Sequence, residues 1–262
     1  MGKRIGLWLI AVAVTLVAAR WQRTTGPTYP VQGSVAVGGA AIPICLERSH
    51  GGDTDQPVRI ATDDAEISGE VRWHRYPTDD PWTVIPMART RRGLEAALPN
   101  QPPAGRLEYQ VRLTRRGEQA VFPELPAVTR FKGEVSPYVL VPHVLAMFVG
   151  MLLSTRAGLE AVTRSGDARR LTTHTLGFLV IGGLLLGPMV QKAAFGSYWT
   201  GVPFGWDLTD NKTLVAAAAW GWAAWRSRRG RGARWEIVAA SIVTLAVFAI
   251  PHSAWGSRIE WE

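Results

Sequence analysis

Cysteine is nearly absent from this chain, because Cys45 is the only one among its 262 residues. A single cysteine excludes an internal disulfide, so packing and hydrogen bonds must hold the fold together. The sequence also lacks a Walker phosphate loop, closely spaced cysteine pairs for zinc and the Gly-x-Ser-x-Gly turn of serine hydrolases. These absences exclude the best-marked nucleotide-binding, zinc-binding and hydrolase classes. We expect Cys45, within IPICLE, to be a buried strand residue.

Apolar residues are abundant and unevenly distributed. They make up 47% of the chain and concentrate in five runs, at residues 5–19, 138–154, 171–190, 213–225 and 235–250. A helix that crosses the hydrocarbon core of a membrane needs about 20 apolar residues. The third run meets this length, and the last two approach it if flanking Trp, Thr and Arg residues enter the interface. The runs also lack the polar face of a water-soluble helix. The sequence therefore predicts an integral membrane protein.

The first apolar run allows two interpretations. MGKRIGLWLIAVAVTLVAAR has a basic start, an apolar middle and small residues at its end, which is also the pattern of a cleaved secretion signal. Arg20 and Trp21 suit an anchor that ends in the membrane interface, and Val17-Ala18-Ala19 is a middling cleavage site. We favour a retained anchor over residues 1–23. Either interpretation sends the following segment across the membrane.

Charge predicts the orientation of the helices. Loops on the cytoplasmic side of a membrane carry an excess of Lys and Arg. Residues 1–4, 155–170 and 226–236 contain eleven basic and three acidic side chains, which accounts for the net charge of +8 of the whole chain. We place these segments in the cytoplasm and interpret RSRRGRGAR as a topology signal, so nucleic acid is not an expected partner. The expected location is a bacterial inner membrane, crossed several times, with the C-terminus outside.

Residues 24–136, which this orientation places outside the cytoplasm, have the pattern of β-strands. In RLEYQVRL every second residue is apolar, namely Leu107, Tyr109, Val111 and Leu113. EVRWHRY and GLEAALP alternate in the same way, and segments rich in Gly, Pro, Asp and Asn separate them. The pattern predicts an antiparallel β-sandwich, which resembles fibronectin-type or immunoglobulin-like domains in architecture. Such a fold implies no activity. We expect His74 to be a solvated surface residue.

Residues 137–262 predict a bundle of four transmembrane helices, which makes the whole chain an α+β membrane protein. Gly183 and Gly187 form a small-xxx-small pattern that lets helices approach closely. We interpret it as packing within the bundle, with dimerisation as the alternative. Two Pro-His pairs place His143 and His252 near the outer membrane face. An ionisable residue at that depth is a functional candidate, and the alternative is an interfacial hydrogen-bonding role.

The segment FGSYWTGVPFGWDLTDNKT, within the predicted outer loop 192–212, is the most unusual part of the chain. Its aromatic residues suit the membrane interface, and Thr209 or Asp210 can cap the next helix. These roles leave the polar cluster beside Trp206 unexplained, so we expect a polar-aromatic pocket on the outer face. The ligand-binding candidates are Trp199, Trp206, Asp207, Asp210, Asn211 and Lys212, and the haem or metal candidates are His143 and His252.

Part of this segment, YWTGVPFGWD, resembles the tryptophan-rich segment of the haem-handling membrane proteins of cytochrome c maturation. In that family a Trp-rich signature lies in an outer loop, and histidines of flanking helices ligate haem. The resemblance implies that Trp199, Trp206 and Asp207 occupy signature positions, with His143 and His252 as the flanking ligands. Haem is thus the cofactor that the resemblance implies, whereas the residues taken by themselves specify none.

Three classes of function remain. The first is a non-enzymatic membrane protein whose β-domain and Trp-rich outer loop bind or position a protein partner, as an accessory or assembly component of a membrane complex. The second is a haem-binding or metal-binding transfer protein that uses the outer pocket. The third is a membrane enzyme in which Asp207 or Asp210 acts as acid or base. No nucleophile–base pair supports the third class, so we assign no catalytic residue. The expected partners are the lipid bilayer and a protein of the membrane or periplasm.

Overall fold

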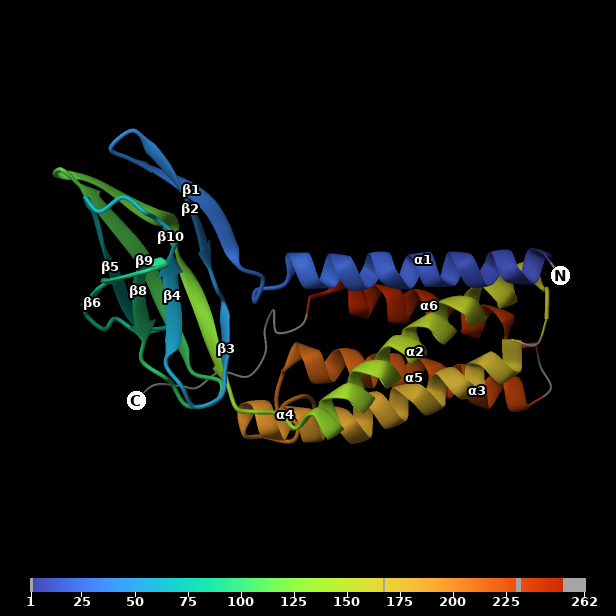
Figure 1. The fold of residues 1–262 in the computed structure, drawn as a ribbon. Helices are drawn as coiled ribbons and strands as arrows, with labels where there is room; N and C mark the ends of the chain where they lie inside the picture. The colour runs from blue at the N-terminus through green and yellow to red at the C-terminus, as the bar shows by residue number, and fades with distance from the viewer. Residues whose placement is uncertain (1, 167, 230–231, 252–262) are drawn as a thin grey trace. The chain divides into compact units, whose positions relative to one another are not determined.

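The chain is an α+β protein, and the computed structural model describes its residues 2–166, 168–229 and 232–251 (Figure 1). It divides into a helical unit, which contains residues 2–27 and 135–251, and a β unit of residues 28–134. The N-terminal helix expected at residues 1–23 is present as α1 (Gly2–Thr25). Among these described residues, three helical segments are long and apolar enough to cross a membrane: α1, α2 (Pro137–Thr163) and the continuous segment Ala168–Phe195.

The β unit contains three sheets. A two-stranded sheet pairs β1 (Val31–Val37) with β2 (Ala40–Leu46). A five-stranded sheet has the order β3 (Ser49–Gly51), β10 (Glu118–Lys132), β9 (Arg106–Arg115), β5 (Ile67–Arg75) and β6 (Thr83–Pro86). A three-stranded sheet has the order β4 (Gln56–Ile60), β8 (Gly93–Leu98) and β7 (Ala88–Thr90). The strand pairs are antiparallel except for β3, which runs parallel to β10.

The core of the β unit follows the alternation seen in the sequence. The four apolar residues predicted to share one face of β9 are all fully buried, namely Leu107, Tyr109, Val111 and Leu113. Buried side chains from all three sheets join them in a single cluster. The Tyr109 hydroxyl donates a hydrogen bond to the Glu47 carbonyl at 2.6 Å. Burial raises the pKa of Tyr109 above its usual range, so the side chain enters the core as a neutral phenol.

Two expectations for the β unit were wrong. Cys45 is exposed, because the pleat of β2 turns Ile44 and Leu46 into the core and the residue between them outward. The imidazole of His74 is only 10% exposed, and its Nε2 atom lies 3.1 Å from Oε2 of Glu108. Glu108 is directly opposite His74 across the β5–β9 pair, and Trp82 packs edge-on against the imidazole with a centroid distance of 4.3 Å. Cross-strand neighbours thus cover a residue that the local pattern places at the surface.

The remaining helices pack around α2 and α5. A continuous rod comprises α3 (Ala168–Leu179), the π-helix η1 (Val180–Leu186) and α4 (Gly187–Phe195), and it is followed by α5 (Leu208–Arg228) and α6 (Arg234–Ala249). Helix α2 contacts α1, α3 and α6, and α5 contacts α3 and α6 (Figure 1). Trp220 of α5 is fully buried and donates a hydrogen bond from Nε1 to Thr244 Oγ1 at 2.8 Å. A Cβ atom at Gly183 would collide with Thr213 Cγ2, so this glycine serves close packing inside the unit.

Helix α2 extends further than its apolar run. Residues 155–170 were expected to connect two helices, but α2 continues through Thr163. This extension buries Arg156 and Glu160, whose side chains are 2% and 1% exposed and form an ion pair one helical turn apart. The Arg156 guanidinium also lies over the Trp8 ring of α1, at 5.4 Å from its centroid. Because the two buried charges compensate each other, the helix can continue past the end of the apolar pattern.

Candidate functional site

The candidate site is the segment between α4 and α5, which we call the aromatic loop (residues 196–207). Helix α4 ends at Phe195, and the capping residue Gly196 that follows has a φ of 86°, the left-handed conformation typical of a helix C-terminus. Helix α5 begins after Asp207, whose carboxylate accepts a hydrogen bond from the Thr209 amide at 2.8 Å. Asp207 therefore caps α5 and satisfies one of the amides that lack a partner inside the helix. The sequence assigned this cap to Thr209 or Asp210.

Asp210 holds the middle of the loop. Its Oδ2 atom accepts hydrogen bonds from the main-chain amides of Thr200 at 2.6 Å and Gly201 at 3.0 Å. The same oxygen accepts a hydrogen bond from Gln191 Nε2 at 3.1 Å. Asp210 is buried, and amides that converge on a carboxylate compensate for its removal from water. The first turn of α5 thus fixes the backbone of a segment ten residues earlier.

Neighbouring side chains complete this bracing. Asn211 Oδ1 accepts a hydrogen bond from the Val202 amide at 2.8 Å. The Thr200 hydroxyl donates to Asp207 Oδ2 at 3.0 Å, and Gln191 Nε2 donates to the Thr200 hydroxyl at 2.8 Å. The three polar residues that begin α5 therefore bind their own loop, which makes the loop a fixed part of the helical unit.

Gly201 is required where the loop meets α5. A Cβ atom at this position would lie 2.7 Å from Asn211 Oδ1 and 2.7 Å from the Cβ atom of Asp210. Real Cβ atoms do not approach other heavy atoms this closely, so a larger residue would push the loop away from α5. The glycine explains how the backbone of the loop comes near enough to be held by two side chains of one helical turn.

Three of the four aromatic side chains of the loop are exposed. Phe204 is 83% exposed and Trp206 is 87% exposed, and Tyr198 and Val202 are exposed as well. Trp199 is half-buried, and its Nε1 atom donates a hydrogen bond to the Val202 carbonyl at 3.1 Å. The loop thus exposes apolar side chains, while hydrogen bonds from polar side chains hold its backbone. Of the six ligand-binding candidates, the structure leaves Trp206 exposed and engages the other five within the helical unit.

Lys212, the last of these candidates, binds the end of α6 and not the aromatic loop. It is buried, and its Nζ atom donates hydrogen bonds to the carbonyls of Ile250 at 2.8 Å and Pro251 at 3.4 Å. These carbonyls follow the end of α6. The ammonium group therefore connects the start of α5 to the end of α6.

His143 lies in α2, beside the π-helix. Its Nδ1 atom is 2.8 Å from the carbonyl oxygen of Gly182. A carbonyl can only accept, so Nδ1 carries the proton and Nε2 of a neutral ring keeps its lone pair. His252 lies outside the described residues. Within residues 2–166, 168–229 and 232–251, no three His, Cys, Asp or Glu side chains are close enough together to hold a metal ion.

Sequence reasoning missed two residues of the bracing, Gln191 and Thr200. Gln191 is an amide at the end of an apolar run, where a polar side chain must find a partner, and this was the available signal. Thr200 carried no signal, because its role depends on the fold of the loop. No family model, curated protein or solved structure matches the chain.

Proposed function

We propose that the chain is a multi-pass protein of a bacterial inner membrane in which α5 and α6 cross the bilayer together with α1, α2 and the α3–α4 rod. Three apolar helical segments long enough to span support this assignment. The packing of α5 and α6 onto α2 and α3 supports it further, as does the concentration of positive charge in the connections at residues 164–170 and 226–234. In this arrangement the β unit is an antiparallel sandwich outside the cytoplasm, supported by the single core that its three sheets share.

Topology reporters test this arrangement. Fusions after Arg116 and Thr200 should report an extracytoplasmic position, and fusions after Arg164 and Arg229 a cytoplasmic one. The expectation follows from the number of crossings between these points and from the charge of the connections. A cytoplasmic signal after Thr200 would reject the assignment, because it would leave the α3–α4 rod on one side of the membrane.

We infer that the protein acts as a non-enzymatic accessory or assembly component, and that its aromatic loop binds a protein partner. The observation that carries this inference is that polar side chains at the start of α5 are used to hold the loop, whereas aromatic side chains of the loop are exposed. Asp207, Asp210 and Asn211 bind the loop itself, while Phe204 and Trp206 are exposed. A carboxylate that already accepts several hydrogen bonds is poorly suited to bind a small ligand or to move a proton.

A braced aromatic loop suits protein binding. Trp and other aromatic residues are enriched in the energetic centres of interfaces. A surface that is already fixed loses little conformational entropy when it binds, so more of the contact energy contributes to affinity. Lipid contact at the membrane interface would use the same side chains but would not require the carboxylate and amide bonds that fix the backbone behind them.

Site-specific photo-cross-linking in native membranes tests this function. A photoreactive residue at position 204 or 206 should give a discrete protein adduct, which is purified and identified. The same residue at Leu185, an exposed position within the apolar segment Ala168–Phe195, is the control and should label lipid. Phe204→Ser in a chain labelled at position 206 should reduce the adduct strongly. Equal labelling at all three positions would reject a specific partner on this loop.

Haem or metal binding is the second candidate, and His143 carries it. Histidines that ligate a metal commonly donate their other ring N–H to a carbonyl or carboxylate, which fixes the tautomer. His143 makes this kind of bond to Gly182, and the π-helix that supplies the carbonyl is a feature frequent at functional sites. A visible absorption spectrum of protein purified from native membrane, with metal analysis, tests this candidate. This candidate is rejected if the sample shows no Soret band and contains no metal, and if the protein takes up no haem when haemin is added.

A further inference from the structure

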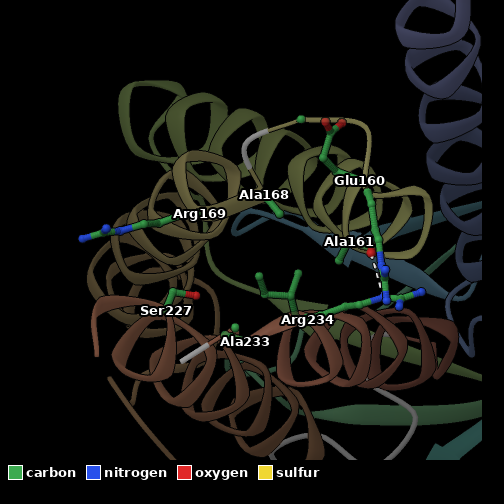
Figure 2. A pocket seen from close by; sticks show the side chains of 11 residues that line it. Glu160, Ala161, Ala168, Arg169, Ser227, Ala233 and Arg234 are labelled. Atoms are coloured by element: carbon green, nitrogen blue, oxygen red, sulfur yellow. Dashed lines mark hydrogen bonds between the residues drawn. The ribbon is translucent and has the colours of Figure 1, made fainter. Parts of the chain in front are cut away.

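A cavity of about 440 Å³ forms an open pocket, lined by residues where α2 ends, α3 begins, α5 ends and α6 begins. Figure 1 shows that these helix ends lie at the opposite end of the helical unit from the connection between α4 and α5. The apolar lining residues of the cavity include Ala161, Ala168 and Ala233, which Figure 2 labels, and Ile237. The volume is that of a small-ligand site, and four separate helix ends contribute to it.

The charged residues of the wall are mainly basic. Arg164, Arg169 and Arg234 line the cavity, and among the residues that the structure describes Glu160 is the one acidic residue that does so. The charge of Glu160 is already balanced by its buried ion pair with Arg156. In Figure 2, Arg169 extends away from the cavity at its rim. The wall therefore carries a net positive charge, to which Arg164 and Arg234 contribute beside the apolar surface.

Arg234 is fixed in place by the end of α2. Its Nε atom donates a hydrogen bond to the Ala161 carbonyl at 3.0 Å, which Figure 2 shows, and its Nη2 atom donates to the Val162 carbonyl at 3.1 Å. A guanidinium has more N–H donors than these two bonds use. It can therefore hold its position in the wall and still bind an anion, and phosphate is, with carboxylate, an anion that its planar fork suits.

We propose that this cavity binds a phosphate group, carried by a phospholipid headgroup or by a soluble phosphate compound. Arg164 and Arg234 supply charge-assisted donors for the phosphate oxygens, and the alanine and isoleucine side chains accommodate the apolar part of the ligand. The connections around the cavity are the basic segments that we place at the cytoplasmic face. Basic cavities between membrane helices at that level are suited to anionic headgroups.

The backbone conformation of Arg164 allows its side chain to be removed without disturbing the end of α2. Arg164 caps the C-terminus of α2 with a φ of 51°, in the left-handed region. Glycine adopts this conformation without the steric penalty that other residues pay, and it is the residue most common at such positions. Arg164→Gly should therefore remove one guanidinium from the cavity and leave the helix end intact. Arg228→Gln, on the exposed end of α5, is the control, because it removes one positive charge near the same membrane face without altering the cavity.

Native mass spectrometry of the full chain in detergent measures lipid retention directly. The probes are phosphatidylglycerol and a diacylglycerol with the same acyl chains, which lacks phosphate. The wild-type protein should retain phosphatidylglycerol in preference to diacylglycerol. Arg164→Gly should retain it about tenfold less well, the loss expected when charge-assisted hydrogen bonds are removed, and Arg228→Gln should match the wild type.

A second measurement separates the two sources of phosphate. Inorganic phosphate is added to delipidated protein, and its effect on the melting temperature is compared with that of an equal concentration of chloride. A rise in the wild type that is absent in Arg164→Gly, without preferential retention of phosphatidylglycerol, would keep the phosphate site and assign it to a soluble ligand. If the wild type, Arg164→Gly and Arg228→Gln behave alike in both measurements, the proposal is wrong.

Discussion

Gln22 of α1 donates a hydrogen bond from Nε2 to the main-chain carbonyl of Phe248 in α6, at 2.9 Å. Its neighbour Trp21 donates from Nε1 to the Ala249 carbonyl at 3.2 Å, and Lys212 donates to that of Ile250 at 2.8 Å. The last carbonyls of a helix have no partners within the helix. Side chains of α1 and α5 therefore complete the end of α6, which makes α1 a structural part of the helical unit.

Gln22→Ala should lower the free energy of unfolding of the helical unit by about 1 kcal/mol, because it removes the side-chain donor to the Phe248 carbonyl. Thermal unfolding in detergent micelles measures this loss. Val17→Ala, at an exposed position of the same helix, is the control and should change stability by less than about 0.5 kcal/mol. Equal effects of the two substitutions would mean that the clamp between α1 and α6 contributes nothing measurable.

Asp210→Asn should loosen the aromatic loop. A single oxygen of Asp210, Oδ2, accepts the Thr200 and Gly201 amides, so the asparagine oxygen can still accept them but lacks the negative charge that strengthens these bonds. Replacing charge-assisted hydrogen bonds by neutral ones should cost about 1–3 kcal/mol. We expect a protease to cleave the loop of this variant faster than that of the wild type in micelles, and we expect the variant to have a lower melting temperature. Asn211→Ala removes one neutral hydrogen bond and should have a smaller effect. The reverse order of the two effects would contradict the central role of Asp210.

Gly201→Ala should destabilise the protein by about 1–3 kcal/mol, because the added methyl group would overlap atoms of Asp210 and Asn211. Gly221→Ala is the matched comparison, since a Cβ atom at Gly221, inside α5, would meet nothing within 4 Å. Alanine favours a helix over glycine by about 1 kcal/mol, so this second variant should gain stability. Unfolding of both variants in the same detergent checks the prediction, which fails if they shift in the same direction.

Tyr109→Ala should lower the free energy of unfolding of the β unit by about 3–5 kcal/mol, since the side chain is fully buried. Tyr109→Phe keeps the ring and removes the hydrogen bond to the Glu47 carbonyl, so it should cost about 1 kcal/mol. The measurement is urea unfolding of a soluble fragment of residues 24–133, which we expect to fold by itself into a strand-rich domain. Aggregation of this fragment, or a helical circular dichroism spectrum, would contradict an independent β-domain.

In the aromatic loop, the unusual residues could be predicted from the sequence, but their hydrogen-bond partners could not. Asp207, Asp210 and Asn211 could be selected as unusual from their position beside Trp206. Their partners could not be found, because the Thr200 and Gly201 amides come within reach only after the loop folds back on α5. Whether a carboxylate binds a ligand or the protein's own backbone depends on how close the folded loop comes to α5. No periodic pattern in the sequence indicates that distance.

The sequence by itself determined the α+β composition, the N-terminal helix, the long apolar helices and the buried face of β9, because periodicity and apolar length are local properties of the chain. Only the tertiary structure decided that His74 is covered by Glu108 and Trp82, that Arg156 and Glu160 neutralise each other inside α2, and that four helix ends line one pocket with basic side chains. Each of these outcomes depends on which distant segments meet. A charge or a polar group takes its role from the partner that packing brings to it, and local patterns do not specify that partner.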